Sequence, residues 1–270
     1  MELIKPWSGF DIKYALFDFD GTISLIREGW QNIMIPYFCE VLRETGTDES
    51  DEQIKTCVTD FVDFLTGKQT IYQCMRLDEE VVKRGGEKRD PLVYKREYLR
   101  RLEERIADRK KALADKSAKP EDYLVPGIKP FIAELQRSGI KCYLASGTDE
   151  VDVLREASLL GLDGIFEGGI HGARDEMLAC SKELVIKDMI GREKIKPAEL
   201  VSFGDGYVEI ELVAQLGGLA IGAATEEEKR EGVNAWKRSR LIAAGAYAII
   251  PDFREAKEIC DAVRSDMNAL

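Results

Sequence analysis

Short apolar runs that end in polar, turn-forming residues recur along the chain. The runs lie at 14–19, 141–145, 200–203, 218–221 and 246–250. The first three lead into Asp20-Gly21-Thr22, Ser146-Gly147-Thr148 and Gly204-Asp205-Gly206. Brief apolar runs bounded by turn residues are typical of buried strands. The pattern therefore predicts five buried strands, three of which end in polar turns.

Segments with helical character separate these strands. They are predicted at 129–137, 151–160 and 182–190. Strands that alternate with helices predict an α/β fold, a doubly wound parallel sheet with helices on both faces. In such a sheet the carboxyl ends of the strands form the ligand crevice. We therefore expect the three polar turns to lie together.

The stretch 26–122 has a different pattern, because it lacks buried-strand runs. Helices are predicted within it at 33–43, 51–66 and 93–113. The last of these is highly charged, which indicates a solvated helix face more than a binding surface. A linker at 115–126, with two prolines, marks the return to the sheet. We predict an α/β core domain of 1–25 and 123–270, interrupted by an all-α cap domain of 26–122.

The charge balance narrows the possible partners. The chain has 39 Lys and Arg against 50 Asp and Glu, a net charge of −11. Nucleic-acid binding needs clustered basic residues, so it is not expected, whereas a small phosphorylated ligand remains compatible. No apolar stretch approaches the roughly 18 to 20 residues of a membrane span, and the first ten residues lack a signal-peptide core. We expect a cytoplasmic protein, and the sequence leaves monomer and homodimer open.

Cysteine and histidine usage disfavours a zinc site and histidine-pair chemistry. The cysteines are scattered without a Cys-x-x-Cys pair, so reduced and mostly buried thiols are expected. They are Cys39, Cys57, Cys74, Cys142, Cys180 and Cys260. His171 is the one histidine of the chain, which excludes mechanisms that need two. It lies in a glycine-rich stretch, and we expect a loop residue with ordinary hydrogen bonds.

Carboxylates gather at the predicted strand ends. Asp18 and Asp20 flank the end of the first strand, and Asp205 and Glu209 follow another. Like charges and burial would raise the pKa values of the first pair unless a cation lies nearby. A helix cap or a turn would explain one of these two aspartates but hardly both. Oxygen-rich clusters of this kind suit Mg²⁺.

Four short motifs together resemble the haloacid dehalogenase superfamily of aspartyl phosphatases. In chain order they are DFDGT at 18–22, YLASGT at 143–148, Lys182 at the start of a predicted helix, and FGDGYVEIE at 203–211. Each motif alone is short, but the ordered set is specific. Members with a helical cap, such as phosphoglycolate phosphatases and β-phosphoglucomutases, are the most similar in organisation.

The resemblance assigns a role to each motif residue. It implies that Asp18 is the nucleophile and that Asp20 is the general acid and base. It also implies phosphate binding by Ser146, Gly147 and Lys182. The implied cofactor is Mg²⁺, held by Asp18, the main-chain carbonyl of Phe19 and Asp205, with Glu209 ordering a metal-bound water. Arg27, Glu28 and Trp30 are candidates for substrate contact, with hinge packing and surface charge as the alternative.

The function implied is Mg²⁺-dependent hydrolysis of a small phosphorylated metabolite through an aspartyl-phosphate. A sugar phosphate, a polyol phosphate and phosphoglycolate are all compatible substrates. A phosphosugar mutase is the alternative enzyme, and Asp20 argues against dehalogenation because the dehalogenase branch generally lacks it. A phosphonatase is disfavoured because no cap lysine for an imine can be identified. A non-catalytic binding module with a relict site is the alternative outside enzymes.

Overall fold

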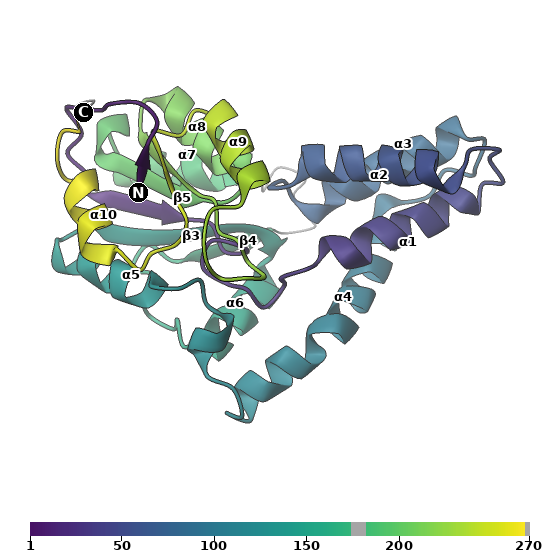
Figure 1. Ribbon diagram of the computed structural model, residues 1–270, viewed down its shortest axis with the longest axis horizontal. Helices are drawn as coiled ribbons and strands as arrows, with labels where there is room; N and C mark the ends of the chain where they lie inside the picture. The colour runs from purple at the N-terminus through teal and green to yellow at the C-terminus, as the bar shows by residue number, and fades with distance from the viewer. Residues whose placement is uncertain (174–181, 268–270) are drawn as a thin grey trace. The chain divides into compact units, whose positions relative to one another are not determined.

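A computed structural model of the chain describes residues 1–173 and 182–267 (Figure 1). The chain forms two units, Met1–Glu28 with Lys110–Leu270, and Gly29–Arg109. The first unit is built around a sheet, and the second is helical. Among the described helices, none combines the length and the apolar character needed to cross a membrane.

In the described part of the chain, seven strands of the first unit form one sheet in the order β1-β7-β6-β5-β2-β3-β4. Their bounds are Glu2–Leu3 (β1), Tyr14–Phe17 (β2), Lys141–Asp149 (β3), Ile170–Ala173 (β4), Leu200–Gly204 (β5), Leu219–Ala223 (β6) and Ala248–Ile250 (β7). Neighbouring strands are parallel except β1 and β7. The five strands predicted from apolar runs are all present, and β1 and β4 are additional edge strands.

Helices cover both faces of the sheet, which confirms the predicted doubly wound fold. On one face lie α5 (Ile128–Arg137), α6 (Glu150–Leu159) and α10 (Ala256–Val263); on the other lie α7 (Lys182–Glu193), α8 (Tyr207–Leu216) and α9 (Ala235–Ala243) (Figure 1). The chain winds from β2 outward to β4, then returns to β5 and continues outward to β7. The direction of winding therefore reverses around β2, where such sheets bind ligands.

The central strand β2 is buried from both sides. Leu16 packs on one face against Ile186 of α7. The neighbouring Phe17 points to the opposite face, where its ring stacks on Phe203 at 5.0 Å and meets Phe131 of α5 at 6.1 Å. A parallel strand covered on both faces carries a continuous apolar run without alternation. This explains why the sequence marked β2 so clearly.

The strand register brings the predicted polar turns to one edge of the sheet. Phe17 pairs with Leu144 of β3 and with Phe203 of β5. The strands run in the same direction, so the residues that follow these three lie level with one another. Within two further residues come Asp18, Ser146 and Asp205. Three predicted site residues thus lie at the same end of three adjacent strands.

Two sequence predictions at this edge are wrong. Strand β3 continues to Asp149, with a register shift after Ala145, so Ser146–Thr148 is not a turn. His171 is not a loop residue, because it pairs with Ala145 as part of β4. Strand β4 has four residues and no apolar run, so the pattern gave no sign that β3 would have a partner there. The ring Nε2 of His171 lies 3.2 Å from the carbonyl oxygen of Gly168.

The two segments that connect the halves of the first unit run side by side. The amide of Leu25 donates to the carbonyl of Tyr123 at 2.8 Å, and the amide of Val125 donates to the carbonyl of Ile23 at 2.9 Å. Ser24 and Leu124 form an antiparallel bridge between these bonds. The segment that follows β2 is therefore hydrogen-bonded, inside the first unit, to the segment that leads toward β3.

The second unit contains α1 (Gln31–Arg43), α2 (Asp51–Leu65), α3 (Thr70–Lys83) and most of α4 (Pro91–Ala114), whose end from Lys110 on belongs to the first unit. The sequence predicted α1, α2 and α4. Helix α3 was missed, although its buried residues follow helical spacing. They include Ile71, Cys74, Leu77 and Val81.

The described cysteines are free thiols, as predicted. Cys39, Cys74, Cys142 and Cys260 are buried, Cys57 is half-buried, and Cys180 lies outside the described residues. Burial raises the pKa of the Cys74 and Cys142 thiols to about 12. These two thiols are therefore protonated and unreactive at neutral pH.

Candidate active site

Asp18 lies buried at the carboxyl end of β2, next to a buried lysine. Its Oδ1 accepts a hydrogen bond from the Phe19 amide at 2.7 Å and lies 2.7 Å from Lys182 Nζ. The same ammonium group donates to Glu209 Oε2 at 2.9 Å. Lys182 begins α7 and Glu209 lies in the first turn of α8, so two helix starts supply the partners of one strand end. The structure thus brings together the predicted nucleophile, the predicted phosphate-binding lysine and one predicted acidic residue.

Burial and neighbouring charge shape this cluster. Burial raises the pKa of Asp18 well above its ordinary value, and the carboxylates of Glu209 and Asp205 act in the same direction, whereas Lys182 opposes them. Burial lowers the pKa of Lys182, but the carboxylates of Asp18 and Glu209 outweigh it, so the net shift is upward. The ammonium group therefore stays charged at neutral pH. Positive charge is what such a group of carboxylates requires.

Asp205 is held at the end of β5 by contacts to its backbone and its side chain. Its amide donates to Thr22 Oγ1 at 2.9 Å, and its Oδ2 lies 2.8 Å from Lys237 Nζ. Lys237 also donates to Glu227. Lys237 lies on α9 and Glu227 in the segment before it, and neither belongs to a motif. The sequence analysis missed both residues, because nothing in their local pattern distinguishes them from surface charges.

Asp20 lies in the turn after β2, between a hydroxyl group and a guanidinium group. Thr148 Oγ1 donates to its Oδ2 at 2.6 Å. Within the described residues its Oδ1 accepts no hydrogen bond, and it lies 3.9 Å from Arg27 Nε. Burial raises the pKa of Asp20 to about 6, with Arg27 opposing the shift. A carboxyl group with such a pKa can both donate and accept a proton near neutral pH.

The three candidates for substrate contact are placed differently. Arg27 is buried, and its Nη2 donates to Glu156 Oε1 at 2.8 Å, with Nε within 3.2 Å of both carboxylate oxygens. This buried pair favours the hinge-packing alternative for Arg27. Glu28 is half-buried in the first unit, and Trp30 belongs to the second unit, directly before α1.

Ser146 and Gly147, the predicted phosphate ligands, lie on the irregular end of β3. Ser146 is buried, and its Oγ accepts a hydrogen bond from the Thr148 amide at 3.0 Å. Since Thr148 also binds Asp20, this strand end connects the predicted phosphate ligand to the predicted general acid and base. The sequence analysis did not identify Thr148 as part of the site.

The predicted metal ligands agree only in part with the structure. The carbonyl oxygen of Phe19 accepts hydrogen bonds from the amides of Ile23 and Ser24, both at 2.8 Å. Both lone pairs are therefore used within the turn, and the structure does not favour Phe19 as a metal ligand. Glu209 is also engaged, because its second oxygen, Oε1, accepts from the Gly206 amide at 3.2 Å.

Two of the predicted metal ligands, the carboxylates of Asp18 and Asp205, remain as candidates. Among the described residues, no three His, Cys, Asp or Glu side chains form a ready-made metal cage. Mg²⁺ does not need such a cage, because it is usually bound through one or two carboxylates together with waters and substrate phosphates. The mutual repulsion of Asp18 and Asp205 and their all-oxygen chemistry fit this ion.

Gly21 allows Asp205 to approach the turn. Its φ is +75°, and a Cβ atom built on it would collide with Asp205 Oδ2. A side chain at this position would therefore push against the carboxylate assigned to the metal. The turn after β2 depends on glycine both for its backbone conformation and for space.

We expect Gly21→Ala to destabilise the protein more than Gly139→Ala. Gly139 has a similar φ of +79°, but a Cβ there would meet nothing within 4 Å. The free energy of unfolding of both variants should fall by about 1–2 kcal/mol, because alanine is unfavourable in the left-handed backbone conformation. Only Gly21→Ala must also displace Asp205. Urea unfolding of the two variants measures the difference. Equal losses would contradict this account of the turn.

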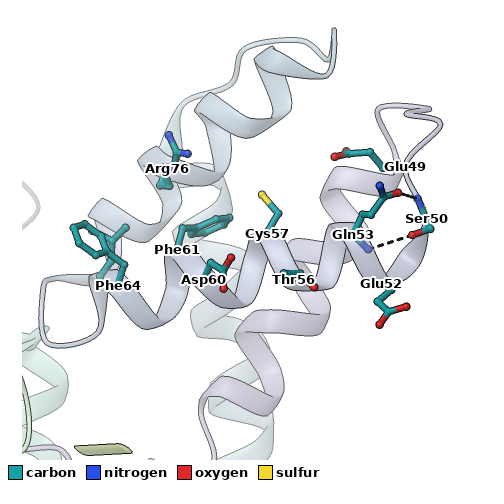
Figure 2. A pocket seen from close by; sticks show the side chains of 11 residues that line it. Glu49, Ser50, Glu52, Gln53, Thr56, Cys57, Asp60, Phe61, Phe64 and Arg76 are labelled. Carbon is teal, nitrogen blue, oxygen red and sulfur yellow. Dashed lines mark hydrogen bonds between the residues drawn. The ribbon is translucent and has the colours of Figure 1, made fainter. Parts of the chain in front are cut away.

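A groove in the second unit is a further concave surface, lined mainly by α2 (Figure 2). Acidic side chains lie along it, including Glu49, Glu52 and Asp60. Among its described lining residues Arg76 is the one cation, and it forms ion pairs with Glu79 and Glu80. This composition does not suit a phosphorylated ligand, so we place the site at the sheet edge.

The sequence matches a known family over most of its length. The family model for haloacid dehalogenase-like hydrolases covers residues 12–217. The protein belongs to this family. No curated protein matches the sequence.

Several solved structures have a similar fold. CbbY from Rhodobacter sphaeroides, in complex with phosphate, is 20% identical with a TM-score of 0.54, covering 90% of this chain and 96% of CbbY. β-Phosphoglucomutase from Clostridium difficile is 14% identical with a TM-score of 0.61, covering 93% and 97%. A phosphonoacetaldehyde hydrolase-like protein from Oleispira antarctica is 13% identical with a TM-score of 0.61, covering 97% and 95%. At these identities the similarity is one of fold.

Proposed function

We propose that the protein is a Mg²⁺-dependent phosphatase that hydrolyses a small phosphorylated metabolite through an aspartyl-phosphate on Asp18. The observation that carries this proposal is the buried contact of Asp18 with Lys182, beside the carboxylates of Glu209 and Asp205. A nucleophilic carboxylate next to a fixed cation is what transfer of a dianionic phosphoryl group requires. Family membership supports the same chemistry.

The proposed roles follow from the contacts of each side chain. Asp18 Oδ1 is held by the Phe19 amide and by Lys182, so we assign Oδ2 as the attacking oxygen. Lys182 and the end of β3 at Ser146 and Gly147 would hold phosphoryl oxygens. Asp18 and Asp205 would hold Mg²⁺, which supplies charge neutralisation when bound.

The reaction then proceeds in two displacements. Asp18 Oδ2 attacks phosphorus, the bond to the ester oxygen breaks, and Asp20 gives its proton to the departing alkoxide. Asp20 next takes a proton from the water that attacks the phosphorus of the aspartyl-phosphate. Inorganic phosphate leaves and Asp18 is regenerated. The raised pKa of Asp20 suits both proton transfers.

A panel of phosphorylated metabolites, assayed for phosphate release, tests the proposal. We expect Mg²⁺-dependent turnover of at least one sugar phosphate, polyol phosphate or phosphoglycolate. EDTA should abolish the activity and Mg²⁺ should restore it, whereas Ca²⁺ should restore little because of its larger and looser coordination. An unchanged rate in EDTA would contradict the metal assignment.

A phosphosugar mutase is the second candidate, supported by the similarity in fold to β-phosphoglucomutase. A mutase would convert a sugar monophosphate into its isomer with little net release of phosphate, and it would need a bisphosphate primer. The same panel separates the two functions when isomer formation is measured beside phosphate release, with and without primer.

A further inference from the structure

Two buried ion pairs connect Asp205, Lys237 and Glu227, and Lys237 and Glu227 have no part in the proposed chemistry. Lys237 Nζ lies 2.8 Å from Asp205 Oδ2 and donates to Glu227 on its other side. The side chain of Lys237 is 10% exposed, that of Asp205 16% and that of Glu227 21%. Lys237 therefore lies between two acidic side chains.

The other contacts of Asp205 leave its carboxylate to be oriented by Lys237. The backbone amide of Asp205 donates to Thr22, and Gly21, which has no side chain, leaves space beside Asp205 Oδ2. Neither contact fixes the plane of the carboxylate. Lys237 does so by binding one oxygen, and Glu227 fixes Lys237 in turn. A carboxylate held through one oxygen can offer the other to a cation.

We propose that Lys237 and Glu227 are positioning residues that orient Asp205 for Mg²⁺. The inference rests on the proposed function, because it assumes that Asp205 holds the metal. Groups that hold the ligands of a metal typically affect its affinity by about 10- to 100-fold. Neither residue touches the substrate or the reacting atoms in the proposed chemistry, so neither is a catalytic residue.

Orientation and charge have opposite effects on metal affinity, which allows a sharp test. A lysine near a cation site repels the cation, so charge alone predicts tighter Mg²⁺ binding when Lys237 is removed. The double variant Lys237→Met/Glu227→Gln removes one positive and one negative charge together. The net charge of the cluster is unchanged, and only the orienting contacts are lost.

Isothermal titration of Mg²⁺ into the wild type and the double variant measures the effect without substrate. We expect the double variant to bind Mg²⁺ about 10- to 100-fold more weakly. A smaller change, or tighter binding, would overturn the proposal. The matched control is Lys187→Met/Glu183→Gln, which changes the same residue types in an exposed pair on α7 and should leave the affinity unchanged.

Thermal unfolding shows whether the double variant is folded. If it is not, Lys237→Arg replaces it, because arginine keeps the charge but displaces Asp205. This variant should also bind Mg²⁺ at least tenfold more weakly, and an unchanged affinity would overturn the proposal. The wild-type titration separates the two hypotheses. A wild type that binds no Mg²⁺ contradicts the proposed metal site, whereas a wild type and a double variant that bind equally contradict only the role of Lys237 and Glu227.

Discussion

Replacing Asp18 with asparagine should abolish turnover and leave the fold intact. An amide cannot form the aspartyl-phosphate, so we expect phosphate release to fall by at least about 1000-fold. The substitution is nearly isosteric, and it removes a charge whose burial is unfavourable, as the raised pKa of Asp18 indicates. Urea unfolding should therefore show little or no loss of stability.

The control for this variant is Asp11→Asn, which makes the same chemical change at an exposed residue. It should retain wild-type activity. Substantial turnover by Asp18→Asn would contradict the covalent mechanism. Loss of both activity and folding would leave the nucleophile untested by this variant, so vanadate inhibition of the wild type provides a second measurement of the same site.

Replacing Lys182 with alanine should have the second largest effect. The ammonium group is buried between Asp18 and Glu209 and supplies the fixed positive charge for the phosphoryl group. We expect kcat/KM to fall by about 100-fold or more, the scale for losing one preorganised charge or donor. The variant should also be less stable, because two buried carboxylates lose their shared partner. Lys182→Arg keeps the charge and should retain more activity than Lys182→Ala.

Lys187 provides the comparison on the same helix. It is exposed and pairs with Glu183, so Lys187→Ala should change kcat/KM by less than about threefold. Both variants are measured on one substrate under conditions where each is folded. A larger effect at Lys187 than at Lys182 would mean that the third motif has been assigned to the wrong lysine.

The fold was largely predictable because a parallel sheet buries its strands on both faces. In β2, for example, Leu16 and Phe17 pack on opposite faces of the sheet. Such strands appear in the sequence as short apolar runs that end in polar turns. Edge strand β4 is different, since IHGA at 170–173 has half-exposed residues and no run. Helix α3 was missed although its apolar residues have helical spacing; its N-cap, Gln69, makes no side-chain cap hydrogen bond, so the sequence has no capping motif where the helix begins.

The site residues that belong to a sequence motif could be predicted. Those that join the site only through contacts with residues far apart in sequence could not. Asp18 and Lys182 are brought into contact as expected for a nucleophile and its cation. The Phe19 carbonyl was predicted to be a metal ligand. The sequence did not show that the amides of Ile23 and Ser24 in the following turn donate to it. Lys237 could not be found, since its contact with Asp205 joins α9 to the residue that follows β5, two positions far apart in sequence.

The paired backbone of 23–25 and 123–125 has a consequence for the length of the insertion. Hydrogen bonds within the first unit join the segment after β2 to the segment before α5, where the inserted helices begin and end. The entropy of closing the insertion therefore varies only slowly with its length, and the strand ends do not have to adapt when the insertion changes. The size of the helical unit can therefore vary without moving the strand ends that carry Asp18, Ser146 and Asp205.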